Sequence, residues 1–227
     1  MSDARMSYLG DFLEHYPLKL YRKGEIIVFQ GEAPRSAYVI KTGVVKAYNL
    51  STSGDEKPIG FLSELSVFPP GWVYGKSPSA MYYFEAFTDT EVYLVPPDEY
   101  VAFVKGNKEL LFLEFERIFS DDIGITMRLN ALQHSRASDK LIYTLHYLAI
   151  SHGKQIGPHE VEIQLELTHQ DFANLTGLTR ETTATELNKL KSLGVIDYGK
   201  RTLYHIQTDK LNTVLNDEFM AELDIKL

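Results

Sequence analysis

With 227 residues, 44% of them hydrophobic and 24% charged, and a formal net charge of −8, the chain has room for one large domain or two small ones. It contains no cysteine, which excludes disulfide frameworks, cysteine-ligated zinc, iron–sulfur clusters and a cysteine nucleophile. The sequence shows neither an apolar run of membrane-spanning length nor a signal-peptide pattern, so we expect a cytoplasmic protein with no membrane partner.

Short β-rich runs separated by turn residues occupy residues 18–97. The predicted strands are Glu25–Gln30, Ser36–Lys41, Val44–Leu50, Pro58–Leu62, Tyr82–Phe87 and Glu91–Val95. Short strands rich in Tyr, Phe and Val at near-regular spacing indicate an antiparallel barrel or jelly roll. The proline- and glycine-rich segment 69–80 predicts a loop that interrupts the strands.

The hydrophobic period becomes helical after Asp98, which predicts a short helix through Val104 and a long helix over residues 108–134. One stripe of the long helix follows an a/d spacing and consists of Leu111, Phe115, Ile118, Asp122, Ile125, Leu129 and Leu132. A second apolar stripe consists of Leu110, Phe112, Phe119, Ile123 and Met127. The helix could be buried entirely against its own barrel. We favour a helix that packs on the barrel with one face and on a twin helix with its a/d stripe, because one barrel covers one stripe.

A second amphipathic helix is expected over residues 139–152, with Ser138 as its N-cap, and an alternating strand over Val161–Leu167. Next come Thr168 and Asp171, which resemble a capping box and predict a short helix. Gly177 supplies the positive φ of a sharp corner, and Thr179 caps another helix that ends at Gly194. A hairpin with a basic turn follows. This order of elements is typical of a winged helix-turn-helix.

The outward side of the helix after Thr179 has the chemistry of a groove reader. Arg180, Glu181 and Thr185 share one broad face, where Arg suits guanine and Glu accepts from cytosine. Thr179, Thr182 and Thr183 offer hydroxyls to phosphates near the helix N-terminus. Lysines 189 and 191 are expected along the DNA backbone. The residues that we assign to the DNA-binding site are Arg180, Glu181, Thr185, Thr179, Thr182, Thr168, Gln170, Lys189, Lys200 and Arg201. The alternative is an ordinary solvated helix face.

The net charge of −8 at first argues against nucleic acid as a partner. Residues 168–210, however, hold six basic and five acidic side chains, a local charge of +1, and the rest of the chain carries −9. The excess of acidic residues therefore lies away from the predicted reading head. Such a weakly positive head is expected to bind DNA mainly as part of a dimer.

These residues carry a resemblance to the Crp/Fnr (cyclic-AMP receptor protein-like) family of transcription regulators, from about Pro17 to Lys210. Segments 23–27, 30–32, 38–46 and 54–57 look like the cyclic-nucleotide-binding β-roll of that family, and segments 178–182 and 187–190 look like its recognition helix. The resemblance implies a homodimer formed through the long helix, with two reading heads on a pseudo-palindromic site. Thr185 falls where the cyclic-AMP receptor type has a second arginine.

The sensor half departs from the cyclic-AMP binders. Residues 61–87 lack both the Gly-Glu pair and the arginine of the phosphate cassette, and their only cation is Lys76. Cyclic AMP binding is therefore not expected. Heme, through His15, His134, His146 or His152, is not expected either, and no cofactor is predicted. The expected pocket is apolar and aromatic, with Phe61, Leu62, Trp72, Tyr74 and Tyr83 and with Thr126 as a polar contact. It either takes a small molecule or is degenerate and empty.

The sequence thus predicts an α+β fold in three parts: a cyclic-nucleotide-binding-like β-roll or jelly roll over residues 1–107, a long dimerisation helix and hinge over 108–137, and a C-terminal winged helix-turn-helix over 138–227. The expected function is sequence-specific DNA binding in transcription regulation. Double-stranded DNA, a second copy of the chain and RNA polymerase are the expected partners. The alternative is a ligand-binding or protein-interaction module whose helix-turn-helix no longer reads DNA. An enzyme is not expected, because residues 18–97 contain no histidine for a metal-binding barrel.

Overall fold

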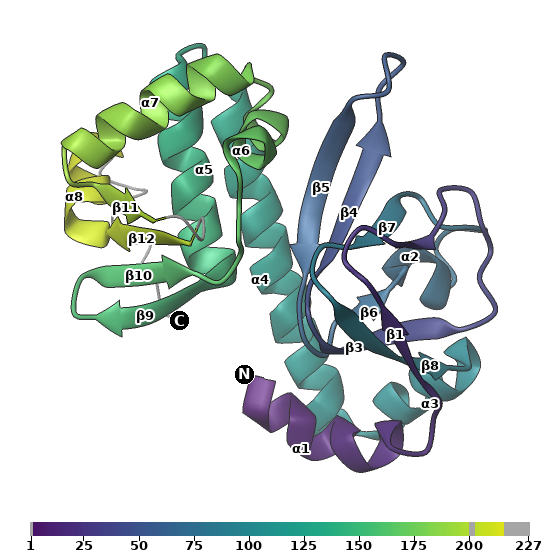
Figure 1. The fold of residues 1–227 in the computed structure, drawn as a ribbon. Coiled ribbons are helices and arrows are strands. Elements are labelled where there is room, and N and C mark those ends of the chain that lie inside the picture. Colours follow the sequence, from purple (N-terminus) through teal and green to yellow (C-terminus); the bar gives the residue numbers. More distant parts are fainter. Residues whose placement is uncertain (1, 200–202, 216–227) are drawn as a thin grey trace. The chain divides into compact units, whose positions relative to one another are not determined.

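A computed structural model describes residues 2–199 and 203–215 of the chain (Figure 1). The chain divides into two compact units, Met1–Arg117 and Ile118–Leu227. The division falls inside one long helix, so both units contain part of it. The three-part division expected from the sequence stays a prediction.

The first unit combines short strands with helices. Its elements are α1 (Ser2–Leu13), β1 (Leu18–Tyr21), β2 (Ile26–Val28), β3 (Ala37–Thr42), β4 (Val45–Leu50), β5 (Glu56–Leu62), β6 (Val67–Phe68), α2 (Pro70–Val73), β7 (Tyr83–Ala86), β8 (Thr90–Val95), α3 (Pro97–Gly106) and the start of α4 (Lys108–Gln133). The strands form two antiparallel four-stranded sheets, in the orders β1-β8-β3-β6 and β2-β7-β4-β5. The predicted β-roll with a following long helix is therefore confirmed.

One hydrophobic core lies between the two sheets. Val45 and Phe84 come from one sheet, and Ile40, Phe68 and Val92 come from the other. Aromatic rings contribute to this core: Phe68 stacks on Phe84, with their centroids 5.2 Å apart. Burial of these apolar side chains is the main force that holds the sheets face to face.

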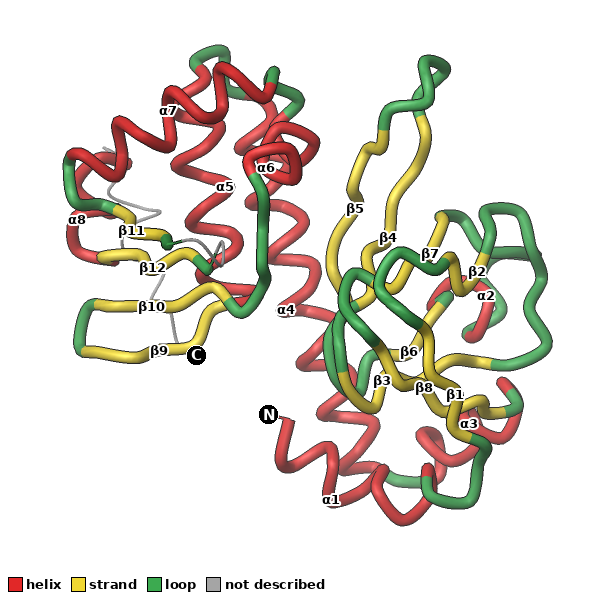
Figure 2. The backbone as a smooth tube through the Cα atoms, viewed as in Figure 1, coloured by secondary structure: helices red, strands yellow, loops and turns green. Residues whose placement is uncertain are grey.

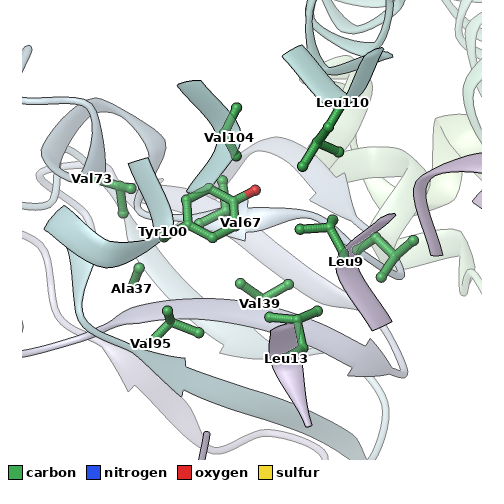
Figure 3. Close-up of a cluster of buried hydrophobic side chains, with 11 residues drawn as sticks. Leu9, Leu13, Ala37, Val39, Val67, Val73, Val95, Tyr100, Val104 and Leu110 are labelled. Atoms are coloured by element: carbon green, nitrogen blue, oxygen red, sulfur yellow. The ribbon is translucent and has the colours of Figure 1, made fainter. Parts of the chain in front are cut away.

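A second core covers the other face of the sheet that contains β3. Val39 points to this side and Ile40 to the first core, as the two-residue period of a strand requires. Figure 3 shows Val39 facing Leu13 of α1 and Tyr100 of α3. The helices α1, α3 and the start of α4 therefore close the sheet on this side.

Gly43 makes the tight connection between β3 and β4. Its φ is +91°, and a Cβ atom at this position would lie 2.5 Å from the carbonyl oxygen of Asp89. Any other residue would have to move the backbone of the neighbouring turn. Gly43 is thus required by both its conformation and the close approach of the chain.

The second unit contains the remainder of α4 and a helical layer next to a small sheet. Its elements are α5 (Ala137–His152), β9 (Gly153–Gly157), β10 (Glu160–Ile163), α6 (His169–Thr176), α7 (Arg180–Ser192), β11 (Ile196–Tyr198), β12 (Tyr204–Gln207) and α8 (Thr208–Leu215). The antiparallel sheet has the spatial order β11-β12-β10-β9, which can be followed in Figure 2. This is the predicted winged helix-turn-helix.

Helix α5 lies at the centre of this unit and contacts α6, α7, α8 and β10. Its residues 141–149 are buried without interruption. The C-terminal part of α4 approaches α5 closely at Gly124, where a Cβ atom would lie 2.8 Å from Ser151 Oγ and 3.1 Å from a ring carbon of Tyr147. Met127 and Ala131 are buried on the same side of α4. Helices α4 and α5 are therefore in close contact at Gly124.

Several local expectations were wrong. Helix α5 starts at Ala137 with Arg136 as its N-cap, and Ser138 bonds to Asp139 instead of capping the helix. The predicted strand over Val161–Leu167 covers only 160–163, and the polar break before it contains β9. The predicted loop over 69–80 contains the short helix α2. In the second apolar stripe of α4, Leu110 and Met127 are buried, whereas the other three side chains are exposed.

Helices α1 and α8 and strand β1 were not predicted from the sequence. No helix within residues 2–199 and 203–215 is both long enough and apolar enough to cross a membrane.

Candidate nucleic-acid interface

A reciprocal capping box fixes the start of α6. The amide of Asp171 donates to Thr168 Oγ1 at 3.2 Å, and the amide of Thr168 donates to Asp171 Oδ2 at 2.7 Å. The helix ends at Gly177, whose φ of +68° turns the chain toward α7. Both features were predicted, and together they set the corner between the two helices. Gln170 is exposed on α6 and donates to Asn174 at 2.9 Å.

Thr179 caps α7, as predicted. The amide of Thr182 donates to Thr179 Oγ1 at 3.2 Å, and the two hydroxyl oxygens are 2.9 Å apart. The hydroxyls of both threonines therefore serve the helix start itself. Any contact of theirs with a phosphate would have to share the same oxygen atoms.

Helix α7 has one buried and one exposed face. Thr183, Leu187 and Leu190 are buried, and the helix contacts α5 and α6. Arg180 and Glu181 are exposed in the first turn. The expected phosphate contact by Thr183 is wrong, because its side chain is 0% exposed and belongs to the packed face.

The exposed face has a further member in Thr185. Its hydroxyl donates to the carbonyl oxygen of Glu181 at 2.9 Å. The structure thus brings Arg180, Glu181 and Thr185 onto the exposed side of one helix. This agrees with the spacing argument from the sequence, and their contacts with DNA stay a prediction.

The two lysines of α7 differ in their partners. Lys189 reaches Glu186 on its own helix at 2.6 Å, with its side chain 62% exposed. Lys191 instead bonds to Asp197 at 2.8 Å and to the carbonyl oxygen of Tyr198 at 2.7 Å. Lys191 therefore ties α7 to β11. The two predicted contacts in the wing turn, Lys200 and Arg201, lie outside the described residues.

Tyr198 connects several elements behind the reading face. Its hydroxyl donates to Asn188 Oδ1 of α7 at 3.0 Å, and its ring lies under the Lys191 ammonium at 4.5 Å. The ring of His169 from α6 packs edge-on at 5.7 Å, and that of Tyr204 from β12 lies 4.7 Å away. Sequence reasoning missed this role, although an aromatic residue at the end of a hairpin strand was a signal. Tyr198 holds α6, α7 and the sheet in register.

His169 lies near the start of the reading helix. Burial and then the charge of Arg180 lower the pKa of His169 below its usual value. The imidazole is therefore neutral at pH 7, and Arg180 is the positive group at this corner. A positively charged first residue of α7, at the positive end of the helix dipole, favours an anionic partner.

The a/d stripe of α4 is open to solvent. Leu111, Phe115, Ile118, Ile125, Leu129 and Leu132 are between 39% and 56% exposed, and Asp122 is exposed between them. Phe112, Phe119 and Ile123 extend this apolar surface. A run of exposed large apolar side chains along a helix favours a protein partner.

The predicted pocket residues of the first unit lie in different places. Leu62 packs against the core between the sheets, whereas Trp72 and Tyr74 pack against the core under α1 and α3. Phe61 is buried next to Phe87, with their rings 5.0 Å apart.

The other two predicted pocket residues are also separate. Tyr83 stacks on Tyr48, with their centroids 5.3 Å apart, and Thr126 is exposed on the part of α4 that belongs to the second unit. The six predicted residues are thus spread over several clusters. Their role in ligand binding stays a prediction.

The charges of the first unit are compensated where they are buried. Lys76 is exposed. Lys46 of β4, which sequence reasoning did not single out, is buried between Glu56 at 2.6 Å and Glu85 at 3.2 Å. Its ammonium therefore has carboxylate partners already.

Comparison with family models gives two matches. A model described as cyclic nucleotide-binding domain matches residues 18–107, and one described as Crp-like helix-turn-helix domain matches residues 139–214. They cover the β-roll and the second unit after α4.

Curated relatives match along most of the chain. The global nitrogen regulator of Synechocystis is 26% identical over 196 residues, which are 86% of this chain and 87% of the relative. The cyclic AMP receptor protein of Thermus thermophilus is 25% identical over 204 residues, which are 84% of each chain.

Solved structures share the fold. A mutant of CooA from Carboxydothermus hydrogenoformans has a TM-score of 0.71 at 19% identity, with 91% of this chain and 90% of that chain covered. FixK2 from Bradyrhizobium japonicum has a TM-score of 0.68 at 20% identity, with 87% and 96% covered.

Proposed function

The chain belongs to the Crp/Fnr family of DNA-binding transcription regulators, and from this premise we propose that it binds a pseudo-palindromic site as a homodimer. The relatives are named as regulators, so the proposal contains no catalytic step. The proposed location is the cytoplasm. The proposed partners are DNA and RNA polymerase.

Helix α7 is proposed to read the major groove of each half-site. The observation that best supports this proposal is the exposed first turn of α7, which contains Arg180 and Glu181. This turn follows a capped N-terminus, and the turn at Gly177 places it next to α6. Arg pairs with guanine O6 and N7, and Glu accepts from cytosine N4, so these two residues suit a G·C-containing core. Thr168, Gln170, Thr179, Thr182 and Lys189 are proposed to position α7 on the phosphates.

The homodimer is proposed to form through the exposed a/d stripe of α4. Six large apolar side chains at heptad spacing are open to solvent on this helix. Pairing with a second α4 buries them by knobs-into-holes packing. A dimer of two reading heads also offsets the weak local charge of +1 that each head carries over residues 168–210.

A molecule other than cyclic AMP is proposed as effector of the β-roll. A cyclic phosphate in a protein interior needs a fixed cation. Within residues 61–87 the cation is the exposed Lys76, and Lys46 is engaged by Glu56 and Glu85.

Selection of bound sequences from random DNA tests the function. The expected result is an inverted repeat whose half-sites contain a G·C-rich core, bound with an affinity that falls as salt rises. A sequence-blind, salt-insensitive mobility shift contradicts the proposal and favours a module that no longer reads DNA. Native mass spectrometry of the same sample reveals a retained ligand, and addition of cyclic AMP should leave the melting temperature unchanged.

A further inference from the structure

Thr185 lies on the exposed face of α7. The buried stripe of the helix contains Thr183, Leu187 and Leu190. Because successive residues of a helix are rotated by about 100°, Thr185 projects almost opposite to this stripe, one turn after Glu181. A helix that enters a groove with its exposed face therefore brings Thr185 to the base edges.

The hydroxyl hydrogen of Thr185 is already used within the helix. Thr185 Oγ1 donates to the carbonyl oxygen of Glu181 at 2.9 Å. A threonine hydroxyl has one hydrogen to donate, so this bond leaves Thr185 with its methyl group and a lone pair of the oxygen. To a DNA base it offers an apolar contact and a hydrogen-bond acceptor.

This combination matches thymine paired with adenine. In the major groove thymine presents its 5-methyl group, which packs well against a threonine methyl, and the paired adenine presents the N6 amino donor. Guanine presents two acceptors, N7 and O6, which need a donor that Thr185 lacks. Cytosine offers a donor but has no methyl group.

We propose that Thr185 selects a thymine in each half-site by contact with its 5-methyl group. This inference rests on the proposed function, in which α7 reads DNA, and it adds the base chosen at one position.

The test uses the full-length protein and its selected DNA site. Each thymine is replaced in turn by uracil, which keeps the base pairing and removes only the methyl group. One symmetry-related pair of thymines is expected to lose affinity on replacement, by about fourfold per half-site, the equivalent of about 0.8 kcal/mol for one buried methyl-sized group.

Substitutions at position 185 identify the side chain responsible. Thr185→Ser should bind thymine and uracil equally at that base, whereas Thr185→Val, which keeps a methyl group, should retain the difference. Thr185→Arg should change the preferred base to guanine. The matched control is Thr213→Ser, since Thr213 of α8 is also exposed and donates to the carbonyl oxygen of Asp209 at 2.9 Å. It should behave as the unsubstituted protein.

The outcomes distinguish a failure of the inference about Thr185 from a failure of the proposed function. If the protein selects an inverted repeat but no thymine shows a methyl effect, or if Thr185→Ser keeps that effect, the inference is overturned and the proposed function stands. If the protein selects no sequence at all, the proposed function is overturned and the inference falls with it.

Discussion

Arg5 of α1 and Glu114 of α4 form a buried ion pair in which Arg5 Nε donates to Glu114 Oε1 at 2.9 Å. Both side chains are at most 5% exposed. Arg5 also donates to the carbonyl oxygen of Leu65 at 2.7 Å, and Arg117 reaches the other oxygen of Glu114 at 3.3 Å. This network joins the first helix of the chain to the long one.

Glu114→Ala is expected to lower the free energy of unfolding of the first unit by about 3–5 kcal/mol, because it leaves the Arg5 guanidinium buried without its carboxylate. Urea unfolding followed by the fluorescence of Trp72 measures this, since the single tryptophan packs against the core of the first unit. The double variant Arg5→Met/Glu114→Leu should recover most of the loss. The exposed pair of Arg22 and Asp89 supplies the control, and Arg22→Ala should leave the unfolding midpoint nearly unchanged. A loss below about 1 kcal/mol for Glu114→Ala would show that water reaches the pair.

Arg180→Ala should weaken binding to the selected site by about 1–3 kcal/mol and relax the preference for one base pair. The reason is the loss of a bidentate contact between the guanidinium group and guanine O6 and N7. Fluorescence anisotropy with the selected site and with single-base variants measures both effects. Arg180→Lys keeps the charge without the fork, so it should retain nonspecific affinity and lose discrimination. Full sequence preference in the alanine variant would contradict the assignment of α7 as reader.

Lys189→Gln and Lys191→Gln are expected to differ in the salt dependence of binding. Removal of Lys189, which is largely exposed, should reduce the slope of log affinity against log salt by about one. Lys191→Gln should leave the slope unchanged and instead lower thermal stability, because Lys191 holds Asp197 and the carbonyl of Tyr198. If both variants show the same slope, either both lysines contact phosphate or neither does. The assignment of the contact to Lys189 alone would then be wrong.

Phe115→Glu and Leu129→Glu should each convert the dimer to monomers, because a carboxylate in an apolar helix seam has no partner. Sedimentation velocity measures the change, and circular dichroism checks that the helices remain. Ile156→Glu is the matched control, since Ile156 is also an exposed apolar residue and lies on β9. Dimers that persist in both α4 variants would exclude the seam.

The second unit should lose stability as pH falls from 7 toward 5.5. His146 is 0% exposed and burial lowers its pKa, and burial lowers the pKa of His152 to about 4. In the unfolded chain these histidines take up protons near pH 6.5, whereas the folded unit does not, so acid favours unfolding. Each such histidine contributes a slope of up to about 1.4 kcal/mol per pH unit.

Thermal unfolding by far-UV circular dichroism at a series of pH values measures this effect, and Trp72 fluorescence follows the first unit separately. The histidines whose pKa is lowered by burial, His146, His152 and His169, all lie in the second unit, so its transition should move more. His146→Leu should flatten the slope. An unchanged slope would mean that His146 is protonated inside the fold.

Local chemistry made much of the second unit predictable. The capping box of Thr168 and Asp171, the turn at Gly177 and the cap at Thr179 depend on residues within four positions of each other. Ser138 failed because a cap residue also needs the right backbone position, and the helix begins two residues earlier than predicted.

Features that depend on distant contacts were not predictable in this way. Helix α1 is held by Leu9 and Leu13, which pack on residues from α3 and the sheet, and no local signal marks that packing. The burial of Thr183 and the pairing of Lys191 with Asp197 likewise depend on how α7 sits on its neighbours. The heptad stripe of α4 was readable, because periodicity needs no partner to be visible.

The close approach at Gly124 has a consequence for the DNA itself. With Tyr147 and Ser151 against its backbone, α4 contacts α5 closely at Gly124, and α5 in turn contacts α7. In a dimer formed through this part of α4, the distance between the two α7 helices is therefore set inside the protein. The length of the spacer between the half-sites follows from that distance. A larger residue at position 124 should leave the bases within each half-site unchanged and alter the number of base pairs between them.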